Sequence, residues 1–208
     1  MATKHPLKKV KAPRAAEVCE HFELREEARP LLGERTTPRE FLDALIAAGQ
    51  CQSAIAFLAH ALPHREAVWW GCLCLKQVSG SGLPEPQTAA LKAAAEWVLD
   101  PTEERRNSAK RPAEAAGTGT PAGLLATAVT WTGGSLSPPF PKVPPVPPGP
   151  YMPAKGVSGA VLLASVKVEP PRIAETQRLF VDLGISVAEG RSVWPDVKPQ
   201  PIRRTWGI

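Results

Sequence analysis

The chain has 208 residues, of which 43% are hydrophobic and 22% charged, and it contains 24 prolines and four cysteines. This apolar share excludes disorder along the whole chain, whereas a proline content about twice the usual one predicts uneven order. Four cysteines in this length do not make a disulfide framework, and no apolar run approaches the roughly 20 residues of a membrane-spanning helix. The basic start lacks the apolar segment of a secretory signal, so we expect a soluble, cytoplasmic protein.

Charge is distributed unevenly along the chain, whose formal net charge is +5. Residues 1–14 contain five basic side chains and no acidic one: Lys4, Lys8, Lys9, Lys11 and Arg14. Such a terminus is typical of a solvated, disordered arm, and an arm that docks on an acidic partner or on phosphate is the alternative. No aromatic residue is interleaved with these basic ones, so a stacking platform for bases is absent and nucleic acid is a disfavoured partner.

Residues 15–136 are predicted to form an all-α domain of short amphipathic helices. The first helix is expected over residues 15–32, with Pro30 ending or kinking it. The sequence Thr37-Pro38-Arg39-Glu40 is a capping box with proline at the first helical position, and it begins a helix that stops at Gly49. Further helices are expected over residues 50–62, 64–78, 86–99, 101–116 and 120–132. The short loops between them predict an array in which neighbouring helices pack antiparallel.

A proline-rich stretch, placed at residues 137–154, separates this domain from the C-terminal part. Nine of the 16 residues from Pro138 to Pro153 are proline, which excludes a helix or an inner strand and predicts an extended polyproline segment. It could serve as a spacer, as a strap over the helical body or as a ligand for an aromatic groove. Phe140 and Tyr151 favour the strap, because a free spacer has no need of them.

Two C-terminal helices are expected to pack on the main domain over residues 155–190. Residues 156–168 are compatible with a strand through their β-branched content, but apolar residues at steps of three and four favour a buried helix. A second helix is expected over residues 171–183, with Gly184 as its stop. Residues 191–208 are expected to form an irregular tail.

The cysteine and histidine spacing does not predict a metal site or a cofactor. Cys72 and Cys74 would point about 200° apart on a helix, so buried thiols are the better interpretation. His60 and His64 have a chelating spacing, but Pro63 between them is expected to end the helix. A catalytic pair of one of these cysteines, or of Cys51, with either histidine stays open, although nothing in the sequence around them indicates an activated nucleophile.

Trp69 and Trp70 are the most informative neighbours in the chain. Adjacent helix positions diverge by about 100°, so both rings cannot face one core direction. We expect one in the core and the other at a helix seam or on an exposed patch, because exposed tryptophan is favoured at binding hot spots. The predicted protein-binding residues are Trp69, Trp70, Arg65, Glu66, Trp194 and Trp206.

The run from His60 to Cys74, His-Ala-Leu-Pro-His-Arg-Glu-Ala-Val-Trp-Trp-Gly-Cys-Leu-Cys, resembles a family of uncharacterised bacterial proteins found near type VI secretion genes. The resemblance extends over Ala122–Gly134, the proline-rich strap, Ala154–Ala164 and the segment from Phe180 to Ile185. The family has no established catalytic residues to carry over. The resemblance implies an accessory or adaptor protein that handles effectors or spike components in the cytoplasm.

Taken together, these features predict a non-enzymatic cytoplasmic adaptor or co-chaperone. Its expected partner is a secretion-system effector, a spike component or the chaperone of either. Neither a membrane nor a cofactor is expected. Two alternatives stay open: a cysteine-dependent enzyme, and a nucleic-acid-associated protein that uses residues 1–14.

Overall fold

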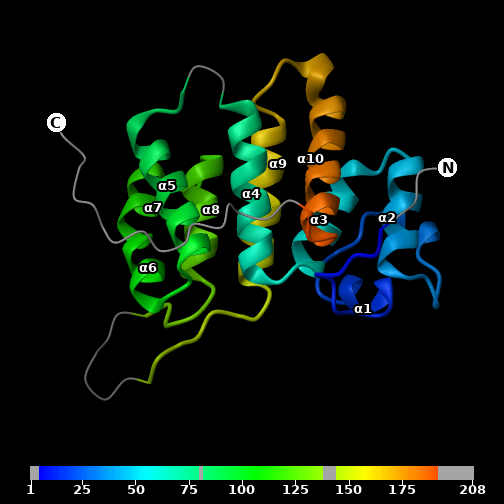
Figure 1. Ribbon diagram of the computed structural model, residues 1–208, viewed down its shortest axis with the longest axis horizontal. Helices are drawn as coiled ribbons and strands as arrows, with labels where there is room; N and C mark the ends of the chain where they lie inside the picture. The colour runs from blue at the N-terminus through cyan, green and yellow to red at the C-terminus, as the bar shows by residue number, and fades with distance from the viewer. Residues whose placement is uncertain (1–4, 80–81, 138–143, 192–208) are drawn as a thin grey trace.

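The structure is a computed structural model that describes residues 5–79, 82–137 and 144–191, and every regular element in those ranges is helical. The longer helices are α2 (Pro38–Ala47), α3 (Cys51–Ala61), α4 (His64–Val78), α5 (Glu85–Leu99), α8 (Pro121–Thr130), α9 (Met152–Ser165) and α10 (Ile173–Ala188). The shorter elements are α1 (Ala15–Cys19), α6 (Glu103–Ser108), α7 (Lys110–Ala116) and the 3₁₀ helices η1 (Glu26–Leu31) and η2 (Pro170–Arg172) (Figure 1). The predicted all-α class is confirmed. In the same ranges, no helix combines the length and the apolar character needed to cross a membrane.

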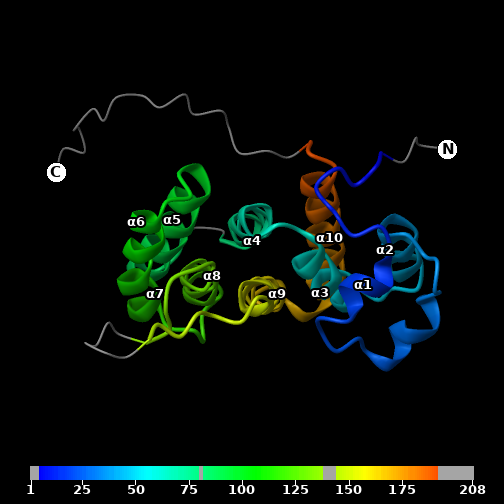
Figure 2. The ribbon, with the colours of Figure 1, turned by 90° about the horizontal axis from the view of Figure 1, so that it is seen from below.

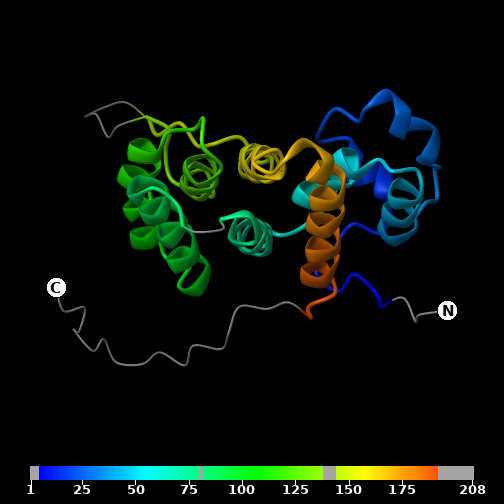
Figure 3. The same cartoon turned by 90° about the horizontal axis from the view of Figure 1, so that it is seen from above.

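Helix α9 lies at the centre of the array. It packs against α8 on one side and against α3 and α10 on the other, while α4 runs alongside it (Figures 2 and 3). Helices α5, α6 and α7 form the end of the molecule beyond α8, and α1 and α2 form the opposite end (Figure 1). The helices predicted over residues 155–190 therefore complete the core and do not lie on an already finished domain. The reason is that α9 is buried around most of its circumference, as a core helix must be.

Residues 156–168, for which helix and strand were both open, form most of α9. The helix begins earlier than predicted, at Met152, because Pro153 suits the first helical turn, where no N–H donor is needed. Four fully buried apolar residues confirm the helical spacing: Val157, Ala160, Val161 and Ala164.

The capping box predicted at the start of α2 is present. The Thr37 hydroxyl accepts a hydrogen bond from the Glu40 amide at 3.3 Å, and the Glu40 carboxylate accepts one from the Thr37 amide at 2.9 Å. These reciprocal bonds satisfy two amides that the first turn leaves without partners. The helix ends at Ala47, and Gly49 follows with a φ of 69°, a left-handed conformation that costs glycine little.

The prediction of one helix over residues 15–32 is wrong. The chain forms α1, leaves helical geometry after Cys19 and then makes the 3₁₀ turn η1. In the segment between α1 and η1, the adjacent rings of His21 and Phe22 both pack against the helical body. Ring centroids are 3.8 Å apart for His21 on Tyr151 and 4.7 Å apart for Phe22 on His60. Adjacent side chains of a helix diverge by about 100°, so a continuous helix would not place both rings inward.

Two further boundaries differ from the predictions. The helix expected over residues 101–116 is divided at Ala109 into α6 and α7, since Pro112 has no N–H to bond the carbonyl four residues earlier. Helix α10 runs past Gly184, which was expected to end it. A Cβ on Gly184 would lie 2.9 Å from Cε2 of Trp70, so this glycine allows α10 to approach α4.

Residues 5–14 lie against the helical body, whereas a disordered arm was expected over residues 1–14. The Lys9 amide donates a hydrogen bond of 2.8 Å to the Ala188 carbonyl, and the Lys9 ammonium lies 3.1 Å from the Glu66 carboxylate. Apolar residues spaced among the lysines pack against the core and account for the order: Leu7, Val10 and Ala12.

The described part of the strap predicted over residues 137–154 turns back on the segment before it. The Leu136 amide donates a hydrogen bond of 2.8 Å to the Val146 carbonyl. Tyr151 then returns the chain to the body by stacking on a ring beside α1, which agrees with its expected role in a strap. Phe140 lies outside the described residues.

Candidate functional site

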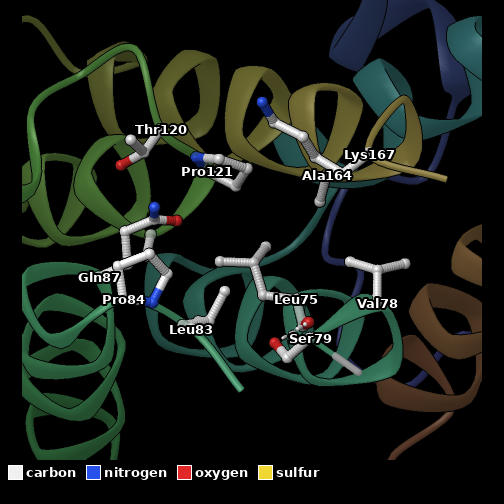
Figure 4. Close-up of a pocket in the computed structure, with 11 residues that line it drawn as sticks. Leu75, Val78, Ser79, Leu83, Pro84, Gln87, Thr120, Pro121, Ala164 and Lys167 are labelled. Carbon is white, nitrogen blue, oxygen red and sulfur yellow. Dashed lines mark hydrogen bonds between the residues drawn. The ribbon is translucent and has the colours of Figure 1, made fainter. Parts of the chain in front are cut away.

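A hollow of about 210 Å³ opens where the ends of four helices meet. It lies between the C-terminal ends of α4 and α9 and the N-terminal ends of α5 and α8 (Figure 4). The end of α4 and the start of α5 are joined by a short loop, whereas α8 and α9 come from later segments of the chain, so the tertiary fold completes the hollow. Its walls are made by Leu75, Val78, Ser79, Leu83, Pro84, Gln87, Thr120, Pro121, Ala122, Ala164 and Lys167.

Local hydrogen bonds fix the helix ends around this hollow. The Ser79 hydroxyl donates to the Leu75 carbonyl at 2.7 Å and closes α4. The Thr120 hydroxyl accepts from the amide three residues later at 3.1 Å and caps the start of α8. The Thr88 hydroxyl donates to the Leu83 carbonyl at 3.0 Å, which ties the loop before α5 to its first turn. The walls of the hollow are therefore set before any ligand arrives.

The size and lining of the hollow suit one apolar side chain. Leu75 and Ala164 point into it from opposite sides, and the polar ends of Gln87 and Lys167 lie at its border (Figure 4). Sites for drug-sized ligands and cofactors usually enclose about 300–1,000 Å³. Taken alone, this hollow is smaller than that range and has room for about one side chain.

A second hollow of about 410 Å³ adjoins the first and shares Ser79 and Leu83 with it. It is more open and follows the surface of α4 and α5. Its other lining residues are Lys76, Gly82, Thr88, Leu91, Lys92 and Ala95. We refer to the two hollows together as the α4–α5 groove.

The adjacent tryptophans occupy different environments, as their divergence on a helix predicts. Trp70 is fully buried, and its indole N–H donates a hydrogen bond of 2.8 Å to the Phe180 carbonyl. Trp69 is half-buried and packs against the core. Trp70 therefore cannot belong to a binding surface, which corrects its place among the predicted protein-binding residues. Trp194 and Trp206 lie outside the described residues.

Arg65 and Glu66, which were expected to rim a tryptophan patch, are engaged within the fold. Arg65 donates to the carbonyls of Val98 and Leu99 at 2.7 and 3.3 Å, and so binds the C-terminal end of α5. Glu66 holds the ammonium of Lys9 at 3.1 Å. These two residues act in packing together α4, α5 and the N-terminal segment.

All four cysteines lie in the described ranges, and none has the surroundings of an activated nucleophile. Burial raises the pKa of Cys72 to about 12 and that of Cys74 well above its usual value. Burial also raises the pKa of Cys19 to about 11 and raises the pKa of Cys51. The thiols stay protonated near neutral pH, whereas the thiolate is the reactive form.

The two histidines with chelating spacing lie on different helices. Nδ1 of His60 is 2.8 Å from the Ala56 carbonyl within α3, and His64 begins α4. In the ranges that the structure describes, no group of three or more His, Cys, Asp or Glu side chains is placed to hold a metal ion.

A third hollow of about 490 Å³, lined by both charged and apolar residues, lies beside α1 and the end of α3. Among its lining residues are His21, His60 and Tyr151, whose rings pack on one another, together with Lys9 and Glu17. The Lys9 and Glu17 charges are paired with neighbours in the fold at 3.1 and 2.8 Å. Two of the three charged lining residues and the stacked rings thus help to pack the N-terminal segment on the body.

The sequence pattern did not reveal the α4–α5 groove. The prolines at 84, 86 and 121 mark helix starts one at a time. The start of α5 follows the end of α4 along the chain, but the meeting of both with the start of α8 and the end of α9 depends on packing between distant segments, which helix periodicity does not encode.

Comparison with known proteins identifies a family but no characterised relative. The family described as "Family of unknown function (DUF6931)" matches residues 41–188, a range that holds every residue lining the groove. No curated protein and no solved structure matches the chain. Because the match spans well over half of the sequence, from α2 to the end of α10, the chain belongs to this family of unknown function, DUF6931.

Proposed function

We propose that this protein is a non-enzymatic adaptor that binds another polypeptide through the α4–α5 groove. The observation that carries the proposal is the apolar hollow sized for a single side chain, with walls held by capped helix ends. Protein partners are commonly anchored by a few buried side chains while surrounding contacts exclude water. The shallower hollow beside it offers a place for a second anchor.

The energetics suit a reversible complex. Burying one leucine, valine or phenylalanine side chain contributes about 1.5–3 kcal/mol. Two anchors therefore supply about 3–6 kcal/mol before the entropic costs of association, and about 4 kcal/mol corresponds to a millimolar Kd. Further contacts outside the groove set the final affinity. A weak anchor that releases its partner is what a carrier or adaptor needs.

The partner class that we propose is a secretion-system effector, a spike component or the chaperone of either, met in the cytoplasm. This part of the proposal rests on the resemblance of the His60–Cys74 run, which lies mainly in α4. The groove supports a polypeptide ligand and does not by itself distinguish among these three partners.

Two observations weigh against the alternative functions. The raised thiol pKa values disfavour a cysteine nucleophile. The packing of residues 5–14 on the body, with the Lys9 ammonium paired to Glu66, leaves fewer free cations for binding phosphate along that segment.

The test compares two leucine substitutions in affinity capture from the native host. Leu83 is half-buried and borders both hollows, whereas Leu179 is 43% exposed on α10, away from the groove. We expect a partner that is retained by the unaltered chain and by Leu179→Asp but lost with Leu83→Asp. Titration of that purified partner should then show a Kd at least about tenfold weaker for Leu83→Asp, equal to about 1.4 kcal/mol.

Circular dichroism and thermal unfolding measure whether both variants fold. If Leu83→Asp fails to fold, Ala164→Met fills the first hollow from its wall and replaces it in the comparison. Equal capture and equal affinity of the partner by the groove variant and by the unaltered chain would overturn the proposed function.

A further inference from the structure

We propose that the partner segment held in the α4–α5 groove is acidic, with apolar anchors flanked by aspartate or glutamate. The inference rests on the proposed function and adds the chemistry of the segment that is bound. Its basis is the sign of the charged side chains that line the two hollows.

Every charged side chain that lines the described groove is a lysine: Lys76 at the end of α4, Lys92 on α5 and Lys167 beyond α9. The surrounding chain has the opposite bias, because acidic residues outnumber basic ones over residues 15–131. A local basic rim on an acidic body attracts a segment of complementary charge and disfavours basic ones.

Two of these lysines have no competing partner within the described residues. The Lys92 ammonium lies 3.9 Å from the Glu96 carboxylate on the same helix, so its charge is partly compensated. Lys76 and Lys167 are exposed and form no ion pair with another described residue. They border different hollows, so carboxylates beside two successive anchors can reach them.

Helix dipoles do not decide the sign of the potential. The starts of α5 and α8 bring partial positive charge to the first hollow, and the ends of α4 and α9 bring partial negative charge. These contributions oppose one another. The ammonium groups therefore determine the preference for an acidic segment.

The lysines of the groove also disfavour the chain's own C-terminal segment as the occupant. Residues 192–208 contain Lys198, Arg203 and Arg204 against a single acidic residue, Asp196. A basic segment would be repelled by Lys76 and Lys167, so a separate, acidic partner is the better match.

The test uses two fluorescein-labelled 12-residue peptides with leucines at identical positions. One carries aspartate between the leucines, and the other carries asparagine, which is nearly the same size but neutral. Each exposed ion pair contributes up to about a fivefold gain in affinity. In anisotropy titrations with the full chain at low salt, we expect the acidic peptide to bind about tenfold tighter. This ratio should shrink as salt is raised towards about 1 M, where screening is nearly complete.

Charge variants locate the effect in the groove. Replacing both Lys76 and Lys167 by glutamine should bring the ratio of the two affinities close to one and leave the Kd of the asparagine peptide unchanged. The matched control replaces Lys110 and Lys155 by glutamine. These two lysines are exposed and do not line the groove, and their replacement changes the net charge by the same amount. The control should keep the tenfold ratio.

The outcomes separate this inference from the proposed function. Equal affinity of the unaltered chain for both peptides overturns the acidic preference and leaves the groove as a docking site. Failure of both peptides to bind at about millimolar concentration overturns the groove itself, and with it the inference. A tenfold gain in peptide affinity on deletion of residues 192–208 would identify the chain's own end as the occupant. A dimer that Leu83→Asp dissociates would identify a second copy instead, and either result overturns the inference.

Discussion

The indole N–H of Trp70 donates a 2.8 Å hydrogen bond to the main-chain carbonyl of Phe180, and this bond joins α4 to α10 in the buried centre of the protein. Gly184 lies one turn further along α10 and faces the same ring. A Cβ there would lie 2.9 Å from Cε2 and 3.0 Å from Nε1 of Trp70. The contact explains why α10 continues through a glycine.

The first prediction concerns Gly184→Ala, which should destabilise the protein. In an unobstructed helix this change stabilises by up to about 1 kcal/mol. Here the added methyl group meets the Trp70 ring, and overpacking of this kind costs about 1–3 kcal/mol. Urea unfolding measures the free energy of unfolding. The loss should be smaller in a Trp70→Phe background, where the ring is narrower, and a gain in stability in the otherwise unaltered chain would contradict the packing described.

The second prediction is an acid sensitivity that originates at Glu189. Burial raises the pKa of Glu189, but hydrogen bonds from Arg39 at 2.7 Å and from Arg191 outweigh it and hold the pKa below its usual value. A carboxylate with a lowered folded-state pKa stabilises the fold above its unfolded pKa, and that contribution is lost as the pH falls through the folded-state value. The free energy of unfolding should therefore decline as the pH falls below about 4.3.

Glu189→Gln removes the titrating group, so its stability should depend less on pH over that acidic range. Urea unfolding at a series of pH values compares the slopes. Glu114→Gln, a change at an exposed glutamate on α7, should retain the original slope. The same slope for Glu189→Gln and the unaltered chain would show that this buried ion pair does not drive acid unfolding.

The third prediction is a lowered pKa for His60. Burial lowers this pKa, the Ala56 carbonyl bonded to Nδ1 opposes the shift, and the charge of Lys155 adds to the lowering. The neutral ring is favoured in the fold, so its contribution to stability is present above about pH 6.5 and is lost as the pH falls below that value. An NMR titration should place the His60 midpoint below about 6.5. Lys155→Gln should raise it, and a midpoint at or above the ordinary histidine value would refute the buried placement.

The fourth prediction is that the native thiols resist alkylation. Cys72 and Cys74 are buried in α4, and burial raises the pKa of Cys72 to about 12. With iodoacetamide at about pH 8, mass spectrometry should find these two cysteines unmodified in the native protein, because the thiolate is the reactive form. All four cysteines should be modified in urea. A native thiol that reacts faster than the same thiol in the unfolded chain would revive the cysteine-dependent enzyme.

Local signals in the sequence predicted the individual helices better than they predicted which helix ends pack together. The Thr37–Glu40 capping box and the three- and four-residue spacing in α9 are short-range patterns, and both appear as predicted. The predicted stop at Gly184 failed because a glycine is read locally as a terminator, whereas its role here is set by Trp70 from another helix.

The site was less predictable than the fold for the same reason. Trp69 and Trp70 attracted attention because large rings are conspicuous in a sequence, yet Trp70 serves the core. The groove is built from ordinary residues such as Leu83 and Ala164, brought together from α4, α5, α8 and α9. Lys9 illustrates the opposite error. As a basic residue near the N-terminus it suggested a disordered arm, but a main-chain hydrogen bond to Ala188 and an ion pair with Glu66 hold it on the body.

Hydrogen–deuterium exchange of the full chain, with and without the partner that it captures, tests most directly whether the α4–α5 groove holds that partner. We expect binding to slow exchange at residues 75–79, 82–92 and 164–168, and Leu83→Asp to abolish this protection. Protection confined to α2, α3 or the N-terminal segment, with none at the groove, would contradict this expectation.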